Sequence, residues 1–88
     1  MRDVYGVAAF RSRQQVLRFE VALRQRGVPT QVVTTPRDIS MGCGLSVRFP
    51  MDYLPEVRRA LAAANPGNLI GLYRAEYDGT RLRVTAVR

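Results

Sequence analysis

A single cysteine, Cys43, stands between two glycines in the stretch TTPRDISMGCGLSVRF, residues 34–49. A cysteine that serves packing usually lies in a helix or strand, where its thiol behaves as a small hydrophobe. Gly42 and Gly44 instead give an incoming group access to the thiol and leave backbone N–H groups to form an anion-binding concavity. The pattern predicts a sulfur nucleophile, and it leaves open a second interpretation, a tight turn with Cys43 packed beneath it.

Positive charge close to the cysteine favours the thiolate over the thiol. Arg11, Ser12 and Arg13 stand where the first helix is expected to begin, and a helix N-terminus carries a partial positive charge. Arg37 and Ser40 belong to the cysteine's own loop. We therefore expect the pKa of Cys43 to lie below its ordinary value of about 8.5. The groups predicted to stabilise the thiolate or a bound anion are Gly42, Gly44, Arg11, Ser12, Arg13, Arg37 and Ser40.

The remaining composition excludes several classes of site. The 88 residues include no histidine and one cysteine, so neither a disulfide within the chain nor a zinc or haem site has enough ligands. Because all 14 basic residues are arginine, a lysine Schiff base is excluded, and the usual general base, histidine, is missing as well. We expect a protein that is not an enzyme and that uses no metal and no cofactor.

The formal net charge of +7 indicates acidic partners, although a preference for arginine codons accounts for it equally well. The arginines are scattered over every segment, so we expect weak, salt-sensitive association with acidic surfaces and no specific binding of nucleic acid. No apolar run approaches the roughly 20 residues that span a bilayer, and the first residues are too short in their apolar part for a signal peptide. We therefore expect a cytoplasmic protein without membrane contact.

Hydrophobic periodicity predicts the secondary structure. Residues 4–10 form an apolar run typical of a buried strand, and residues 12–26 are an amphipathic helix with a capping box at Ser12 and Gln15 and a terminator at Gly27. On that helix Leu17 and Val21 fall outside the buried stripe, which indicates either partial burial against a loop or a dimer contact. Residues 30–35 and 45–49 read as a strand pair with a long loop between them.

A second helix is predicted over residues 52–65, with Asp52 as its N-cap and Pro55 in its first turn. A strand over residues 69–77 follows, then Asp78-Gly79 as a two-residue hairpin turn, and a last strand over residues 80–87. Residues that share one core by their spacing are Val7, Val16, Phe19, Leu23, Val47, Leu54, Val57, Leu61 and Leu72.

This order of elements predicts one domain, residues 1–88, of the α+β class. The fold expected is a ferredoxin-like β-α-β-β-α-β two-layer sandwich with an extra C-terminal β-strand, which forms a hairpin over residues 69–88. Right-handed crossovers then bring the cysteine loop, the start of the first helix and the turn at residues 65–68 to the same end of the sheet.

The stretches YGVAAFRS and PRDISMGCGLSVRF resemble a small prokaryotic family described as selenium/sulfur carrier protein-like. The resemblance covers residues 4–73, and the C-terminal hairpin extends beyond that family-like core. Met41 and Gly42 stand where the family pattern has small serines, so those hydroxyl donors are absent. The positions that match the family pattern are Pro36, Arg37, Ile39, Ser40, Cys43, Gly44, Leu45, Arg48 and Phe49.

The resemblance implies a carrier that holds a persulfide or perselenide on Cys43. Its partners would be a desulfurase-type donor protein of sulfur or selenium and an acceptor protein. Two other hypotheses stay open. One is a binding module for RNA or protein, in which Tyr5 and Phe49 would stack on the bases of a bound RNA. The other is a structural or regulatory domain that forms a homodimer through an exposed strand edge, with an incidental cysteine.

Overall fold

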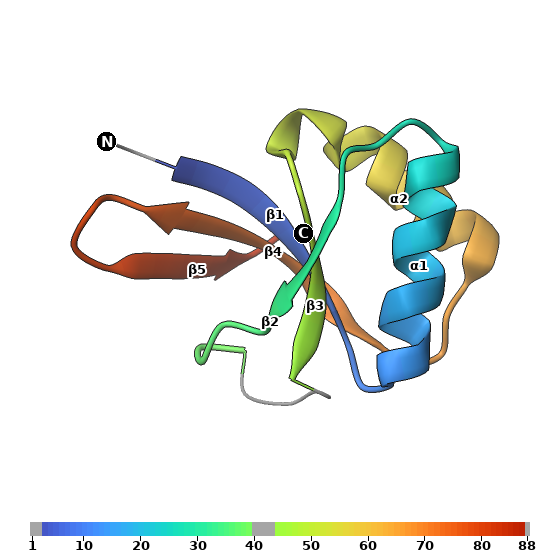
Figure 1. Ribbon diagram of the computed structural model, residues 1–88, viewed down its shortest axis with the longest axis horizontal. Helices are drawn as coiled ribbons and strands as arrows, with labels where there is room; N and C mark the ends of the chain where they lie inside the picture. The colour runs from blue at the N-terminus through green and yellow to red at the C-terminus, as the bar shows by residue number, and fades with distance from the viewer. Residues whose placement is uncertain (1–2, 40–43, 88) are drawn as a thin grey trace.

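The computed structural model describes residues 3–39 and 44–87. The described chain runs strand, helix, strand, strand, helix, strand, strand, in the order that the sequence predicts (Figure 1). A short 3₁₀ turn, η1, precedes the second helix. The elements are β1 (Asp3–Phe10), α1 (Arg13–Gln25), β2 (Gln31–Thr34), β3 (Leu45–Phe49), η1 (Met51–Tyr53), α2 (Leu54–Ala64), β4 (Leu69–Tyr77) and β5 (Leu82–Ala86).

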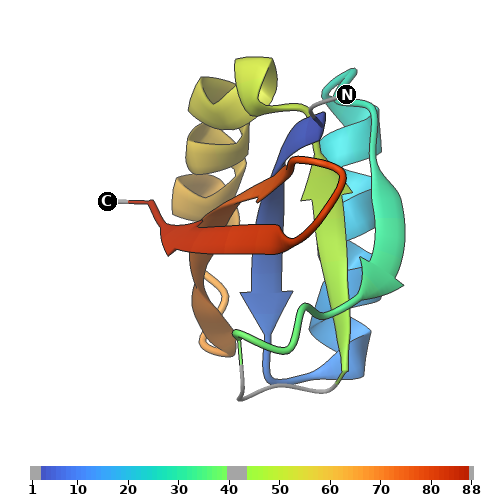
Figure 2. The ribbon, with the colours of Figure 1, turned by 90° about the vertical axis from the view of Figure 1, so that its left-hand side faces the viewer.

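The strands form one sheet in the order β2-β3-β1-β4-β5, and each neighbouring pair is antiparallel. β1 lies at the centre, while β2 and β5 are the edges. Both helices lie behind the sheet when it is viewed from the side of β5 (Figure 2). The predicted α+β class, with two helices packed on one sheet, is confirmed, and all strand pairs of that sheet are antiparallel. Within the described residues, neither helix is long and apolar enough to cross a membrane.

The main core fills the space between the helices and one face of the sheet. The rings of Phe10 and Phe19 meet there with their centroids 5.3 Å apart. Of the predicted core residues, Leu54, Leu61 and Leu72 are partly buried against this cluster. The fully buried members include Ala8, Phe10, Val16, Phe19, Leu23, Val28, Val47, Phe49, Val57 and Ala60.

The prediction that Val7 belongs to this core is wrong. Val7 is buried on the opposite face of the sheet, in a second cluster with Ala9, Ile39 and Ala75. Successive side chains of a strand point to opposite faces, so Ala8 faces the helices while its neighbours face away. β1 is apolar at both sets of positions, and for this reason its pattern alone did not reveal which set meets the helices. The β4–β5 hairpin bends over the second face (Figure 2).

The ends of α1 follow the sequence signals. The backbone N–H of Gln15 donates to Ser12 Oγ at 3.4 Å, which caps the first turn. At the other end Gly27 has φ +81°, and the N–H groups of Gly27 and Val28 donate to the carbonyls of Arg24 and Leu23, each at 3.0 Å. This pair of bonds is a Schellman motif, and it confirms the predicted terminator.

The N-cap predicted at Asp52 is wrong, because Tyr53 is the residue that precedes α2 and no side chain caps the helix. A cap at Asp52 would place Pro55 at the third helical position, where the capping bond needs a backbone N–H that proline lacks. Asp52 lies instead in the 3₁₀ turn η1. The predicted end of α2 is confirmed, since Asn65 adopts the left-handed conformation with φ 44°.

The turn between β4 and β5 is longer than predicted, because the pairing register leaves residues 78–81 as a four-residue loop. The carboxylate of Asp78 accepts hydrogen bonds from the N–H groups of Arg81 and Thr80, at 3.1 and 2.9 Å. These bonds hold the pKa of Asp78 below its ordinary value, with the bond from Arg81 as the largest cause. Such side-chain bonds to following N–H groups stabilise the longer loop. Within this loop Gly79 adopts a positive φ of +96°.

Two leucine-to-alanine substitutions test where the core lies. Leu23 is fully buried and Leu61 is only partly buried. We expect Leu23→Ala to lower the free energy of unfolding by about 2–5 kcal/mol and Leu61→Ala to cost less, because the second site already contacts solvent. Urea denaturation of both variants measures the difference. Equal losses would contradict the arrangement of the core.

Candidate functional site

Three residues of the predicted site, Ser40, Gly42 and Cys43, lie outside the described residues. The predicted nucleophile is therefore not placed. The structure describes the chain on both sides of residues 40–43, up to Ile39 and again from Gly44.

The two arms of the cysteine loop are joined at its base. The backbone N–H of Thr35 donates to the carbonyl of Gly44 at 2.9 Å. The hydroxyls of Thr35 and Ser46 form a second bond at 2.7 Å, and Ser46 is fully buried. Gly44 has φ +88°, a conformation that residues with a Cβ rarely adopt, which explains one of the two glycines beside the cysteine. The base of the loop is thus fixed by the sheet.

The arm before the cysteine packs on the face of the sheet opposite to the helices. Ile39 is 5 % exposed and belongs to the second cluster with Val7 and Ala9. Its N–H donates to the carbonyl of Pro36 at 3.0 Å, which forms a turn. Arg37 is exposed on this turn. The apolar residue of the PRDIS stretch therefore anchors this arm, while its arginine faces solvent.

The start of α1 lies at the same end of the sheet as the start of β3 (Figure 1). Ala9 of β1 pairs with Ser46 of β3, so the chain that leaves β1 for α1 passes the end where β3 begins. The N–H of Arg11 donates to the carbonyl of Asn68 at 2.7 Å, which ties the loop before β4 to the same place. Three connections of the fold therefore meet at one end of the sheet.

The structure brings together some of the predicted site residues. Arg11, Ser12 and Arg13 lie at the end of the sheet that Gly44 occupies. Arg37 is on the other arm of the loop, where it is exposed on the turn that precedes the buried Ile39. The expectation that Arg37 joins Arg11 and Arg13 around Cys43 stays a prediction.

The charges of Arg11, Arg13 and Arg37 are uncompensated. Within residues 3–39 and 44–87, none of these three exposed side chains forms an ion pair with a carboxylate. Elsewhere, acidic side chains pair with arginines at 2.7–3.6 Å, as between Glu20 and Arg24. These three arginines therefore place positive charge on both sides of the cysteine loop, although Arg18 and Arg81 form no ion pair in the same residues either.

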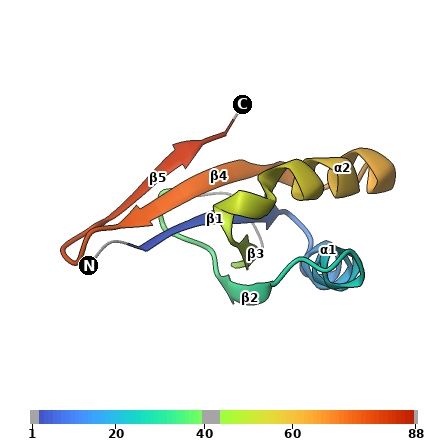
Figure 3. The same cartoon turned by 90° about the horizontal axis from the view of Figure 1, so that it is seen from above.

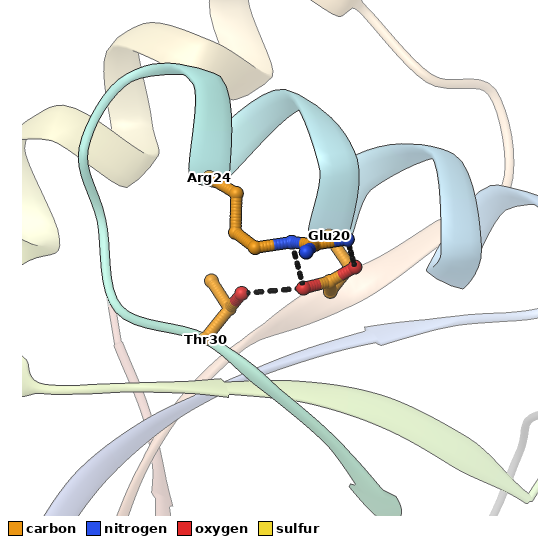
Figure 4. A network of polar contacts seen from close by, with 3 residues as sticks. All are labelled: Glu20, Arg24 and Thr30. Carbon is orange, nitrogen blue, oxygen red and sulfur yellow. Dashed lines mark hydrogen bonds and ion pairs between the residues drawn. The ribbon is translucent and has the colours of Figure 1, made fainter.

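Sequence reasoning missed two polar clusters that join distant segments. Arg48 forms an ion pair with Asp3 at 2.9 Å, and its guanidinium lies 3.8 Å from the centroid of the Tyr5 ring. In the second cluster, Glu20 of α1 accepts hydrogen bonds from Thr30, just before β2, at 2.7 Å and from Arg24 of the same helix (Figure 4). Only the Glu20–Arg24 pair has a sequence signal, its spacing of four residues on a helix.

These contacts bear on the hypothesis of base stacking. Phe49 is 1 % exposed in the main core, so its ring is not available to a ligand. One face of Tyr5 is covered by Arg48. Both aromatic residues are thus engaged within the fold, at the end of the sheet away from Gly44.

The hydroxyl pair at the base of the loop generates a stability prediction. We expect Thr35→Val to lower the free energy of unfolding by about 1–3 kcal/mol, because it leaves the buried Ser46 hydroxyl without its partner. The double variant Thr35→Val/Ser46→Ala removes both groups and should recover part of the loss. Denaturation curves of the single and double variants test this, and a double variant less stable than Thr35→Val would refute it.

Comparison with protein families matches residues 5–72 to a family described as "Putative Se/S carrier protein-like". The match runs from β1 into β4, so β5 lies outside it. The sequence-based estimate of residues 4–73 agrees with this range. None of the curated proteins matches the chain, and none of the solved structures does.

Proposed function

The chain belongs to the Se/S carrier protein-like family, and from this premise we propose that Cys43 carries a sulfane sulfur or selenium atom between two proteins. One observation of the fold supports the proposal most directly. Gly44, which follows Cys43 in the chain, lies at the end of the sheet where α1 begins, and the nearby Arg11 and Arg13 form no ion pair with a carboxylate within the described residues. This environment suits a residue that is anionic both as a thiolate and as a persulfide.

The loading step needs no oxidant or metal. The Cys43 thiolate attacks the terminal sulfur of a persulfide on the donor protein. The sulfur–sulfur bond of the donor breaks, its electron pair leaves with the donor's cysteine as a thiolate, and Cys43 becomes the persulfide. The acceptor repeats this exchange in the second step. The chain acts as a carrier of the atom and not as an enzyme.

We assign the stabilising roles as follows. The partial charge at the start of α1, with Arg11 and Arg13, lowers the pKa of Cys43. The Ser12 hydroxyl accepts the capping bond from Gln15, which leaves its proton to be donated to an anion. Arg37 contributes from the other arm of the loop. Backbone N–H groups at Gly42 and Gly44 and the side chain of Ser40 complete the set.

We also propose that the core of the fold is ferredoxin-like. The order β4-β1-β3-β2 and the β-α-β-β-α-β sequence of elements support this assignment, with β5 added beside β4. A reducing compartment such as the cytoplasm would keep Cys43 reduced between transfers. The partners would be a desulfurase-type donor and an acceptor protein.

The reactivity of the thiol tests the proposal. We expect the pH midpoint of alkylation of Cys43 by iodoacetamide to lie below about 8.5, because the thiolate is stabilised. Arg11→Gln and Arg13→Gln should each raise this midpoint, and Arg37→Gln, on the arm before Cys43, should raise it as well. Arg83→Gln, on the distant hairpin, is the control and should not change it.

The carrier step has its own readout within the same test. After incubation with a cysteine desulfurase and cysteine, mass spectrometry should show one added sulfur on the wild type and none on Cys43→Ser. An ordinary alkylation midpoint together with no sulfur adduct would overturn the proposed function.

A further inference from the structure

Two large aliphatic side chains are exposed on α1. Leu17 and Val21 lie one turn apart and are 47 % and 44 % exposed, while the buried stripe of the helix consists of Val16, Phe19 and Leu23. The sequence left two explanations for Leu17 and Val21, partial burial against a loop or a dimer contact. Their exposure in the fold argues against burial by a loop and leaves the pair available to another molecule.

Uncompensated charge borders these two residues. Arg13 and Arg18 are exposed, and neither forms an ion pair with a carboxylate in the described part of the chain. Arg24, further along the helix, is compensated by Glu20 at 2.7 Å. The outer face of α1 therefore offers a small apolar centre with free guanidinium groups beside it. A complementary surface has apolar side chains surrounded by carboxylates.

A groove of about 320 Å³ lies on the other flank of α1, between this helix and the end of α2. Its lining includes Phe19, Ala22, Ala64 and Pro66, with Arg18 beside them. Arg18 thus lines the groove and also lies one residue from the exposed Leu17. Apolar contact, charge and a concave surface occur together on one helix, which is the combination that protein interfaces use.

The position of this face relates it to the cysteine loop. α1 begins at Arg13, at the end of the sheet that Gly44 occupies (Figure 3 shows α1 along its axis). With a rise of 1.5 Å per residue, Leu17 lies about 6 Å and Val21 about 12 Å along the helix from Arg13. A protein bound to this face would extend to the end of the sheet where the cysteine loop is attached.

We infer that the exposed face of α1, defined by Leu17, Arg18 and Val21, is the docking surface for an acidic protein that donates sulfur to Cys43. The inference rests on the proposed carrier function. A second copy of this chain fits less well, because its charge of +7 and its own arginines would repel this surface. Nucleic acid has no need of the aliphatic pair, and two aliphatic side chains are too few to anchor the helix in a membrane.

The test measures the initial rate of sulfur loading on Cys43 against the concentration of an acidic cysteine desulfurase supplied with cysteine. We expect Leu17→Ser/Val21→Ser and Arg18→Gln each to raise the half-saturating concentration about tenfold, a change that corresponds to about 1.4 kcal/mol. The maximal rate should stay the same. Two control variants lie on the β4–β5 hairpin. Tyr77→Ser removes an equally exposed aromatic side chain, and Arg81→Gln removes an arginine that forms no ion pair in the described part of the chain. Neither control should change the half-saturating concentration or the maximal rate.

Loading by inorganic polysulfide separates this inference from the proposed function. Here the Cys43 thiolate takes one sulfur from the polysulfide chain, which leaves as a shorter polysulfide dianion, and no docking is needed. All variants should load equally from polysulfide. Loading from polysulfide in every variant, with unchanged desulfurase constants in the α1 variants, would overturn the docking surface alone.

No loading from either source would overturn the carrier function and the docking surface together. Sedimentation measurements and titrations with RNA and with anionic vesicles examine the other occupants. A dimer, or binding to RNA or vesicles, that is lost specifically in Leu17→Ser/Val21→Ser would assign this face to that occupant and refute the inference.

Discussion

The antiparallel pairing of β1 with both of its neighbours decides which connections of the chain lie close together. Because β3 and β4 both run opposite to β1, the chain leaves β1 at the end where β3 and β4 begin. The start of α1, the base of the cysteine loop and the turn before β4 consequently share that end. β1 is buried on both faces, so this pairing is protected from solvent and holds the site's surroundings in place.

The cysteine loop depends on this sheet at both of its ends. Thr35 and Gly44 are joined by a backbone hydrogen bond, and Ile39 is buried beneath the loop's first arm. A loop whose base is fixed by a sheet is a common way to present a reactive group on a small scaffold. Arg11, Arg13 and Arg37 near it form no ion pair with a carboxylate in the described part of the chain. Their charges suit the transferable anion that we propose the loop carries.

Local signals explain which features could be predicted from the sequence. The ends of α1 depend on Ser12 and Gly27, whose effects reach only a few residues, and both were predicted correctly. The face occupied by Val7 and the burial of Ile39 depend on tertiary packing, which a run of apolar residues or a loop sequence does not reveal. The Asp3–Arg48 pair joins residues 45 positions apart, so no sequence spacing indicated it. For the site, the sequence indicated that Arg11 and Gly44 share one end of the sheet, but not that Ile39 anchors the arm before the cysteine on the other face.

The proposed function requires Cys43 to act beside the start of α1 and not on the opposite face with Ile39. Because Cys43 is the only cysteine, a nitroxide label on it reports on its surroundings without further mutation. The account predicts that the label broadens the amide NMR signals of Arg13 and Gln15 more strongly than those of Ile70 and Leu82, which lie on the opposite face. Stronger broadening at Ile70 and Leu82 than at the start of α1 would contradict the account.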